Sequence, residues 1–595
     1  MARLLRVAIF MACVFSAGSA FATVVPGGTC PASAPVTGKN CYFIAASGSD
    51  TNNGTSETTP WLHAPGMPNC TSTCAGVSPT AGNGFIFRGG DTWHFGKSSA
   101  SPYTGGTWNL TNTAGNPSTC VYEGTQTGCI YYGVDTTWYN SSNCAAWCRP
   151  ILNGDNPTSA TTVSSCAYQI GSSNQMVYQG AGSGYYNILD NFEMLGLCTS
   201  SATGGNTNAN VYVQDGGSGI TAQGVLFQTN LYINGWTAPT TAGTGSEALA
   251  CVIFSGGNQS LHVMDRIVVD GSDSNPGVCA WATFPSFYHF RDSIIRYATQ
   301  GVGQWCHDIH DSIFEHFYAP NVPTHGNILE CNDDSPGNAP GQPQNTPNVF
   351  YNNVVRHDDP SFVSGGEVHL WFCPEGVPEY WFNNLMYDVG SGNDWDYAGA
   401  PTYSCTNTGG QYMFNNTLVD VVQTCYISTV SHGGKYLTIS NEHLINTPLD
   451  TGTTACTGYN SATNVAMTDA AAITQGYLLS SGGTANADTC ANDGTTPCTA
   501  ILSTDSTITA GTNQQGYCTA LASYTSEPAI GTDAANACKY GTTDGCSYNT
   551  MSHTMICPSA WQAVKRPATT AWDSGAYQFS SVSPPTNGAA TVSGP

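Results

Sequence analysis

One five-residue pattern decides the fold of this chain, and it stands as FRDSI at 290–294, IHDSI at 309–313, FYNNV at 350–354, WFNNL at 381–385 and MFNNT at 413–417. Each copy has an apolar residue, any residue, Asp or Asn, a polar residue and, except in the last copy, another apolar residue. Earlier copies are ILDNF at 188–192 and VMDRI at 263–267, and weaker ones are TAQGV at 221–225 and TISNE at 438–442. The central residues of the copies, 19 to 42 positions apart, are Asp190, Gln223, Asp265, Asp292, Asp311, Asn352, Asn383 and Asn415.

A parallel β-helix explains this pattern. Each copy is predicted to be a short strand in which the residues two before and two after the central position face inward. One such strand cannot bury its apolar face alone, so successive coils must stack into a continuous core. The Asp or Asn is expected at the bend, where it tolerates left-handed backbone, and stacked Asn side chains can hydrogen-bond to one another.

A leucine-rich repeat is the rival solenoid. Its regular leucines and its period of ~20–29 residues are missing here, and helical periodicity is nearly absent. We therefore predict an all-β chain that folds as a single-stranded right-handed parallel β-helix with disulfide-rich caps and loops.

The N-terminal segment predicts export. Arg3 and Arg6 precede an apolar run at 7–15, and a small-residue cleavage site follows at 20–22, so residues 1–22 are interpreted as a signal peptide. No later stretch approaches the ~20 apolar residues that a membrane-spanning helix needs. We expect a secreted protein, extracellular or periplasmic, that does not insert into a membrane.

The cysteines agree with export. The chain has 25, and setting aside Cys13 in the signal segment leaves an even number. The paired CxxC spacing of structural zinc sites is absent, so we expect disulfides formed in an oxidising compartment. Several cysteines lie close together, such as Cys70 with Cys74 and Cys144 with Cys148. The sequence leaves their connectivity open.

Charge narrows the partners. The net charge is −25, and only 9% of the residues are charged. A surface of this sign repels phosphate backbones and anionic lipids, so nucleic acid is excluded as a partner. An acidic sugar remains possible, because a divalent cation can bridge carboxylates on both sides.

Segments outside the repeat carry a family resemblance: YFIAASGSDTNNGTSETTPW at 42–61, GGDTW at 89–93, YTSEPAIGTDAANAC at 524–538 and RPATTAWDSGAYQF at 566–579. They resemble the opening and closing segments of secreted bacterial β-helix proteins, a group that includes pectate-lyase-like and other polysaccharide-active proteins. The resemblance implies the same fold and a polysaccharide partner. Because the segments belong to caps and core, they specify architecture and say little about chemistry.

The expected organisation follows from these patterns. Residues 23–165 are predicted to form an N-terminal cap and first coils, and residues 166–450 the regular β-helix. Residues 451–580 are predicted as last coils and a C-terminal cap, and residues 581–595 as a disordered tail. We expect a monomer.

The position five residues past each central residue predicts a catalytic column. Equivalent positions on neighbouring coils lie ~4.8 Å apart, so side chains distant in sequence become neighbours. The preceding position adds arginines, of which the chain has only nine. The resemblance implies that such a ladder lines an active cleft; the alternative is polar strand ends that face water or cap turns. The residues assigned to catalysis are His316, Arg356, His357, Asp388 and Asp420, and Arg296 is assigned to substrate binding.

A second group of acidic residues predicts a Ca²⁺ site, because this ion prefers carboxylate oxygens. The alternative is a solvated loop in which Asp favours turns. Trp395, in NDWDY, is predicted to stack on a sugar ring, whereas Trp381 occupies an inward position and is expected in the core. The predicted metal ligands are Glu330, Asp333, Asp334, Asp358 and Asp359.

Three functions remain open at this point. In the first, the chain cleaves an acidic, uronate-containing polysaccharide by β-elimination; Arg356 or His357 acts as the base, and Ca²⁺ neutralises the uronate carboxylate. In the second, Asp388 and Asp420 hydrolyse a glycosidic bond, since a rung spacing of ~4.8 Å suits the ~5–5.5 Å separation of retaining enzymes. In the third, the protein is a non-catalytic glycan-binding surface or adhesion rod.

Overall fold

The structure is a computed structural model. It describes residues 28, 30, 41–110, 120, 128–158, 166–180, 186–199, 209–214, 225–237, 250–255, 262–271, 281–284, 288–298, 300–304, 308–317, 326–331, 347–356, 366–371, 378–387, 394–399, 411–420, 422–427, 437–447, 449–450, 462–475, 505–524, 528–542, 547–549, 552–556 and 564–578. The predicted signal peptide and C-terminal tail lie outside these residues.

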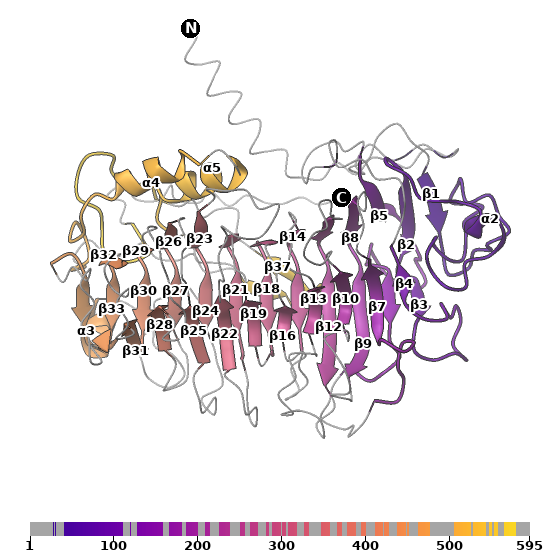
Figure 1. The fold of residues 1–595 in the computed structure, drawn as a ribbon, viewed down its shortest axis with the longest axis horizontal. Helices are drawn as coiled ribbons and strands as arrows, with labels where there is room; N and C mark the ends of the chain where they lie inside the picture. The colour runs from indigo at the N-terminus through magenta and orange to yellow at the C-terminus, as the bar shows by residue number, and fades with distance from the viewer. Residues whose placement is uncertain are drawn as a thin grey trace, which may run out of the picture.

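Three parallel sheets, named here in the order in which the chain enters them, run side by side along the molecule (Figure 1). The first sheet contains β1 (Cys41–Ile44), β2 (Gly84–Gly89), β5 (Ile130–Tyr139), β8 (Tyr186–Asp190), β11 (Val225–Thr229), β14 (His262–Asp265), β17 (Tyr288–Arg291), β20 (Asp308–His310), β23 (Asn348–Tyr351), β26 (Glu379–Phe382), β29 (Gln411–Phe414) and β32 (Leu437–Ser440). The second sheet contains β3 (Thr92–His94), β6 (Ile151–Asn153), β9 (Glu193–Thr199), β12 (Tyr232–Thr237), β15 (Val268–Asp270), β18 (Ile294–Arg296), β21 (Ile313–Glu315), β24 (Val354–Arg356), β27 (Leu385–Tyr387), β30 (Thr417–Val419), β33 (His443–Ile445) and β35 (Val465–Met467). The third sheet contains β4 (Trp108–Asn109), β7 (Gln175–Gln179), β10 (Ala209–Gln214), β13 (Ala250–Ser255), β16 (Trp281–Phe284), β19 (Gln300–Gln304), β22 (Gly326–Cys331), β25 (Gly366–Trp371), β28 (Asp394–Gly399), β31 (Val422–Ile427) and β34 (Leu449–Asp450).

Each regular coil adds one strand to every sheet, and each strand pairs in parallel with the equivalent strand of the next coil. This is the arrangement of a parallel β-helix, so the predicted all-β fold class is confirmed.

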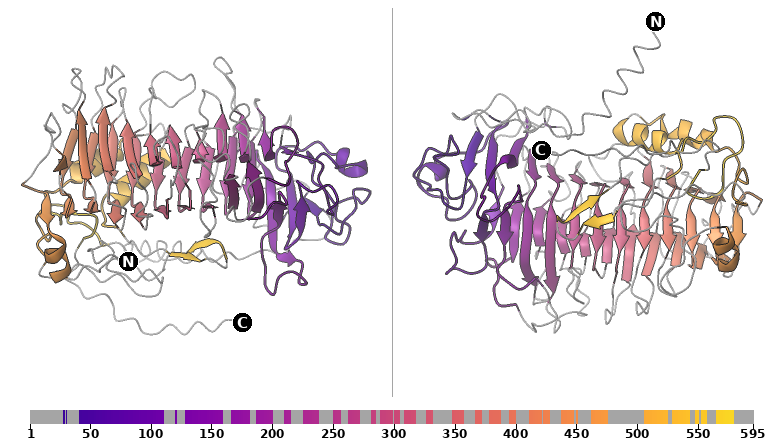
Figure 2. Two further views of the ribbon diagram at one scale, coloured as in Figure 1. Left: turned by 90° about the horizontal axis from the view of Figure 1, so that it is seen from below. Right: turned by 180° about the vertical axis from the view of Figure 1, so that it is seen from behind.

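The C-terminal part of the chain folds back along the solenoid (Figure 2). After α3 (Asp469–Thr474), the helices α4 (Gln515–Leu521) and α5 (Pro528–Ala537) cover the first sheet around β23 to β32 (Figure 1). The hairpin of β36 (Ser547–Asn549) and β37 (Thr554–Ile556) reaches the second sheet, where His553 stacks on Tyr232 at 3.7 Å. Within the described residues no helix has the length and apolar character needed to cross a membrane.

The core fills the space between the three sheets. Residues two before the repeated Asp or Asn pack there from FRDSI onward, as predicted, and Phe350 lies against Trp381 with ring centroids 4.3 Å apart. Trp381 is 3% exposed, so its predicted place in the core is confirmed. Aromatic rings stacked from coil to coil bury large areas with specific geometry, which holds neighbouring coils in one register.

The predicted phase of the repeat is wrong by one residue in the early copies. Met264 pairs with Phe290, so Asp265 pairs with Arg291 and is not the equivalent of Asp292. The bend residue with left-handed backbone is the fourth of VMDRI, Arg266 (φ 54°), but the third of FRDSI, Asp292 (φ 48°). ILDNF has the early phase too, and Gln223 lies outside the described residues.

A second correction concerns the residue two after the bend. It was expected to face inward, but Ile294, Val354 and Leu385 belong to a separate outer cluster that Ala576 of the C-terminal segment covers. The left-handed backbone at the bend shifts the alternation of inward and outward side chains by one residue. The residue directly after the bend therefore faces the interior. Phe192 and Ile267 fill that interior position with apolar side chains in the early coils.

In the later coils the same interior position holds a row of three amides that ends in a carboxyl group. We name this row the inner ladder; it consists of Asn353, Asn384, Asn416 and Glu442. Each amide nitrogen donates to the side-chain oxygen of the next coil, at 3.1, 2.9 and 2.9 Å. The backbone amides of Asn353 and Asn384 donate to the same oxygens. Buried amides paired in this way avoid the cost of unsatisfied polar groups. Stacking of Asn side chains was predicted at the bend position itself, where Asn383 Nδ2 donates to Asn352 Oδ1 at 3.2 Å; the ladder at the interior position goes beyond that prediction.

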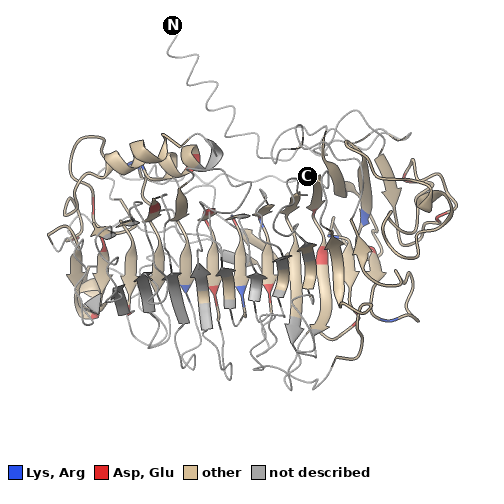
Figure 3. Ribbon diagram, viewed as in Figure 1, with Lys and Arg blue, Asp and Glu red and all other residues tan. Residues whose placement is uncertain are grey.

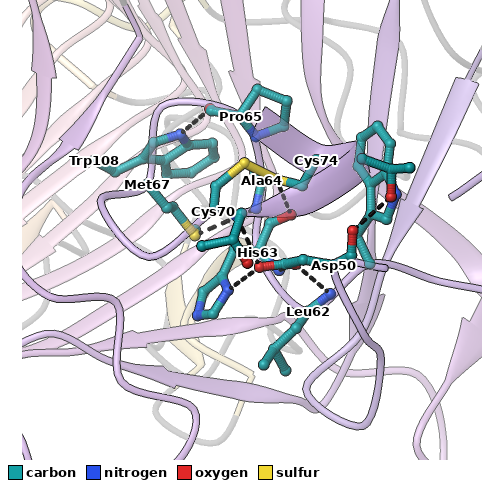
Figure 4. Close-up of a disulfide and its surroundings, with 12 residues drawn as sticks. Asp50, Leu62, His63, Ala64, Pro65, Met67, Cys70, Cys74 and Trp108 are labelled. Carbon is teal, nitrogen blue, oxygen red and sulfur yellow. Dashed lines mark hydrogen bonds and ion pairs between the residues drawn. A yellow bond between two sulfur atoms is a disulfide. The ribbon is translucent and has the colours of Figure 1, made fainter. Parts of the chain in front are cut away.

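The N-terminal cap is built around a buried carboxylate, Asp50 (Figure 4). It accepts hydrogen bonds from the backbone amides of Leu62 and His63, at 3.1 and 2.9 Å, and its other oxygen lies 2.8 Å from Nδ1 of His63. Burial alone raises the pKa of Asp50, but the bonds and charge of His63 outweigh it and lower the pKa. The Cys70–Cys74 disulfide, next to α2 (Ser72–Ala75), closes the same loop.

Disulfides connect cysteines near both ends of the described chain. The prediction that the cysteines form disulfides is therefore confirmed. The described bonds are Cys30–Cys41, Cys70–Cys74, Cys120–Cys129, Cys144–Cys148, Cys166–Cys198 and Cys518–Cys538. Such bonds form and persist in oxidising compartments.

Candidate functional site

The predicted catalytic column lies at the turn that follows the second sheet. Tyr297, His316, Asp420 and Asn446 all have left-handed backbone there. The rings of Tyr297 and His316 stack in parallel at 4.8 Å, and Asn446 Nδ2 donates to Asp420 Oδ1 at 2.6 Å. The described members therefore occupy the same turn on different coils. The other two predicted members, His357 and Asp388, lie outside the described residues, and a catalytic role for the column stays a prediction.

The two arginines assigned beside this column are buried. Arg356 Nε lies 3.1 Å from Glu315 Oε2, and Arg296 Nε lies 3.6 Å from Glu315 Oε1. Burial alone raises the pKa of Glu315, but the two guanidinium groups outweigh it and lower the pKa. Asp270, Arg296, Glu315 and Arg356 pair in register, and Figure 3 shows the resulting alternation of charge along the second sheet. Both arginines thus neutralise a buried carboxylate.

The predicted metal and aromatic sites fall largely outside what is described. Asp333, Asp334, Asp358 and Asp359 lie outside the described residues, and Glu330 and Trp395 are described only as backbone positions in β22 and β28. Among the described residues, no group of three or more His, Cys, Asp or Glu side chains is arranged to hold a metal ion.

The structure brings together a different set of titratable side chains on the outer face of the first sheet. They come from β14, β17 and β20 and from the bends after these strands. We name this set the first-sheet cluster; it consists of Asp265, Arg266, His289, Arg291, Asp292, Asp308, His310 and Asp311.

Two histidines and two carboxylates form the centre of the cluster. Asp308 lies 2.9 Å from Nδ1 of His289 and 3.8 Å from Nε2 of His310. The other ring nitrogen of His310, Nδ1, lies 2.7 Å from Asp311. The ring of His310 also stacks on Tyr351 of the next coil at 4.6 Å. His310 is thereby fixed between two carboxylates.

This environment raises the pKa of two groups, which favours the charged form of His310 and the neutral form of Asp292. Burial alone lowers the pKa of His310, but Asp308 and Asp311 outweigh it and raise the pKa to about 9, so the imidazole is protonated at neutral pH. Burial and the neighbouring Asp311 raise the pKa of Asp292 to about 6. Asp292 therefore keeps its proton to a much higher pH than an ordinary aspartate.

Asp311 has a partner on each of its two carboxylate oxygens. One oxygen faces the protonated His310, and the other accepts a hydrogen bond from Asn352 Nδ2 at 3.0 Å. Its side chain is 39% exposed, so it also reaches solvent. Asp292 and Asp311 occupy equivalent bends on adjacent coils, where equivalent positions are ~4.8 Å apart.

Two guanidinium groups border the carboxylates. Arg266 Nη1 lies 2.7 Å from Asp265 Oδ2, and Arg291 Nε lies 3.6 Å from Asp265 Oδ1. Asp265 is fully buried, whereas the side chain of Arg266 is 53% exposed. Arg266 also donates from Nε to Asn230 Oδ1 at 3.0 Å and from Nη2 to Thr229 Oγ1 at 3.1 Å, so its guanidinium is held toward the preceding coil.

Apolar patches bound the cluster on both sides along the first sheet. Towards the N-terminal cap, Val263 packs with Phe227 and Trp138. Towards the other end, Tyr351 and Phe382 lie beneath α4 and α5. The polar side chains thus occupy the stretch of this face between two apolar patches that other parts of the chain cover.

The sequence contains the signal for this cluster, although the residues were assigned only to strands and turns. In FRDSI and IHDSI the position before the bend faces outward, and it holds Arg291 and His310. In FYNNV and WFNNL the same position holds Tyr351 and Phe382. The outward position thus changes from aromatic residues beneath α4 and α5 to charged residues, and His310 at that position is still buried.

No protein-family model matches this chain, and no curated protein matches it. Among solved structures, the pectate lyase Pel9A has 12% identity and a TM-score of 0.34, and the match covers 92% of this chain and 98% of that chain. A GH136 lacto-N-biosidase from Eubacterium ramulus has 11% identity and a TM-score of 0.35, over 72% of this chain and 68% of that chain. A rhamnogalacturonan lyase has 12% identity and a TM-score of 0.33, over 72% of this chain and 86% of that chain. These TM-scores are too low to support an argument about the fold. The assignment of a parallel β-helix therefore depends on the observed strand pairing alone.

Proposed function

We propose that this protein is a secreted polysaccharide hydrolase in which Asp292 is the general acid and Asp311 is the partner carboxylate. The observation that carries the proposal is the pair itself: two carboxyl groups on adjacent coils, one kept protonated up to about pH 6 and the other paired with a protonated histidine. Hydrolysis of a glycosidic bond needs this division between an acid and an ionised carboxylate.

The rung spacing favours the retaining reaction. Retaining enzymes hold their carboxyl groups ~5–5.5 Å apart, whereas inverting enzymes need ~6.5–9.5 Å to admit water. In the first step Asp311 bonds to the anomeric carbon while the glycosidic bond breaks and the leaving oxygen takes the proton of Asp292. In the second step water gives a proton to Asp292 and attacks the anomeric carbon, which releases Asp311.

The disulfides support the proposed location of the protein, because disulfide-bonded chains fold in an oxidising compartment. We propose that the protein acts outside the cytoplasm, as a monomer, on an extended glycan. Arg291, which directly precedes Asp292 in the chain and acts on its charge, suits a substrate with carboxylate groups as well as one with hydroxyl groups alone.

A second candidate is β-elimination at the predicted column, on a uronate-containing polysaccharide with Ca²⁺. It is favoured by one observation, namely that His316 and Asp420 share the same left-handed turn on different coils. In that reaction a base removes the proton next to the uronate carboxylate, and the cation neutralises the carboxylate.

One assay separates the candidates. The protein is incubated with a panel of uronate and neutral polysaccharides, and the products are followed by reducing-end release and by the ultraviolet absorbance of unsaturated sugars. Reducing ends without absorbance, abolished in Asp292→Asn and Asp311→Asn, support hydrolysis at the first-sheet cluster. Absorbance that disappears with a chelator supports elimination. Binding without any product would identify a glycan-binding rod and overturn both proposals.

A further inference from the structure

The left-handed bends between the first and second sheets form a second row of polar side chains, named here the outer ladder: Asp292, Asp311, Asn352, Asn383, Asn415 and Asn441. Asn352 Nδ2 donates to Asp311 Oδ1 at 3.0 Å, and Asn383 Nδ2 donates to Asn352 Oδ1 at 3.2 Å. Asn415 breaks the row, because its Nδ2 donates to the backbone oxygens of Asp573 and Gly575 instead. The run that reaches Asp311 therefore starts at Asn383.

Arg566 of the C-terminal segment sits at the start of this run. Its side chain is buried, and its Nη2 donates to Asn383 Oδ1 at 2.8 Å. The same guanidinium donates to the backbone oxygens of Tyr540 and Ala576 at 3.1 Å each, and it lies 5.1 Å from the ring of Trp572. These contacts hold the guanidinium in one orientation against Asn383.

An arginine side chain can only donate hydrogen bonds, so its position determines which way the neighbouring amide points. The carbonyl oxygen of Asn383 must face Arg566, and the amide nitrogen of Asn383 must face the other way. That nitrogen meets the backbone oxygen of Tyr540 at 2.9 Å, which requires the same orientation, and it meets Asn352 Oδ1. The nitrogen of Asn352 is then left to point at Asp311.

The result is a directed series of hydrogen bonds from Arg566 through Asn383 and Asn352 to Asp311, with every donor pointing toward the carboxylate. Hydrogen bonds in series polarise one another, and bonds to a charged acceptor favour its ionised form. Asp311 receives the last of these bonds on Oδ1, while Oδ2 faces His310.

We propose that Arg566 is a positioning residue for the carboxylate of Asp311 and acts on it across three coils through the amides of Asn383 and Asn352. This inference rests on the proposed function of Asp311. It assigns to the C-terminal segment a role in the chemistry of the first-sheet cluster in addition to covering the solenoid.

The experiment compares variants of the full chain by the pH dependence of kcat/KM and by Tm. Asn352→Leu removes the last donor without touching the C-terminal segment, and Arg566→Met removes the first donor. Asn415→Leu is the matched control, because it lies in the same ladder and contacts the same segment but is outside the series. Arg566→Lys keeps one donor for Asn383 and tests rescue.

We expect Asn352→Leu and Arg566→Met to lower kcat/KM by about tenfold and to alter the acidic limb of the pH profile. Asn415→Leu lowers Tm but keeps the wild-type profile, and Arg566→Lys restores most of the activity. If Asn352→Leu folds and keeps the wild-type profile, the series has no role, whatever the stability of Arg566→Met. If Asp292→Asn and Asp311→Asn are themselves fully active, it is the proposed function that fails.

Discussion

Glu442 accepts a hydrogen bond from Asn416 across one coil, with Oε1 2.9 Å from the amide nitrogen, and it ends the inner ladder. The side chain is fully buried. Burial raises the pKa of Glu442 to about 8, although the bonds from Asn416 act in the opposite direction. A carboxyl group thus closes a row of amides in its neutral form at neutral pH.

This position predicts a pH-dependent stability that Glu442→Gln removes. The unfolded chain releases the proton near the ordinary pKa of 4.5, whereas the folded chain keeps it to about pH 8, so the folded state binds the extra proton between these values. The stabilisation is complete below the unfolded pKa and is lost as the pH rises through about 8. We expect the wild-type Tm to fall by several degrees from about pH 5 to about pH 9, and that of the variant to fall much less.

Thermal unfolding at several pH values measures this difference. Glu57→Gln is the matched control, because its carboxyl group lies in the N-terminal cap, where burial is far less complete. Equal pH slopes in wild type and Glu442→Gln would show that Glu442 releases its proton at an ordinary pH when folded.

The inner ladder predicts a large stability loss for Asn384→Leu. The side chain of Asn384 accepts from the backbone and side-chain amides of Asn353, and it donates to Asn416 Oδ1 and to the backbone oxygen of Phe350. Removing it leaves buried partners unsatisfied, which costs about 2–4 kcal/mol in the free energy of unfolding. Denaturant titration measures the loss. Asn446→Gly, which removes one exposed bond to Asp420 at a left-handed position that glycine tolerates, should change the free energy by less than about 1 kcal/mol.

His310 predicts a pH dependence of stability in the same direction as Glu442, although here the protonated form is the charged one. Its folded pKa of about 9 lies above the ordinary value of 6.5, so its charge stabilises the folded chain below pH 6.5, and this contribution is lost as the pH rises through about 9. His310→Phe keeps a ring against Tyr351 but loses the charge between Asp308 and Asp311. We expect the Tm gap between wild type and variant to be wide at about pH 6 and to close above about pH 10. A gap that stays constant with pH would contradict this account.

The proposed acid, Asp292, predicts the alkaline limb of the activity. It is protonated below about pH 6, so the rate of reducing-end release should fall as the pH rises through that value. Asn at this position cannot give a proton, and we expect Asp292→Asn to lose at least about a hundredfold in kcat on the polysaccharide. An activated aryl glycoside of the same sugar, whose leaving group needs little protonation, should lose much less. Equal losses on both substrates would assign Asp292 another role.

The fold could be predicted from the sequence because its determinants are local. An apolar residue, a turn-forming Asp or Asn and a second polar residue within five positions are enough to predict stacked strands. The phase of VMDRI could not be read in the same way, since composition favours Asp265 at a left-handed bend, whereas Arg266 occupies it. Only the pairing of Met264 with Phe290 decides between them.

The candidate site was harder to predict because its determinants are not local. Whether an outward residue such as Tyr351 lies beneath a covering helix depends on where α5 lies, and α5 is more than one hundred and fifty residues further along the chain. The burial of Arg296 and Arg356 likewise follows from Glu315 and from neighbouring coils. A position count from the repeat predicts which residues share a column, and it does not predict what covers the column.

The two candidate sites, the predicted column and the first-sheet cluster, predict opposite effects of Ca²⁺ removal on activity. At the predicted column, elimination would need the predicted catalytic residues and Ca²⁺ held by the predicted acidic ligands, so His357→Ala, Asp388→Ala and a chelator should each abolish activity. At the first-sheet cluster, hydrolysis uses the proton of Asp292 and the carboxylate of Asp311. We therefore expect wild-type rates in His357→Ala and Asp388→Ala and no effect of chelator on reducing-end release, with Tm recorded in parallel because a structural Ca²⁺ would alter stability alone. Loss of activity on chelation at unchanged Tm would move the active site to the column and make the first-sheet cluster a structural ion network.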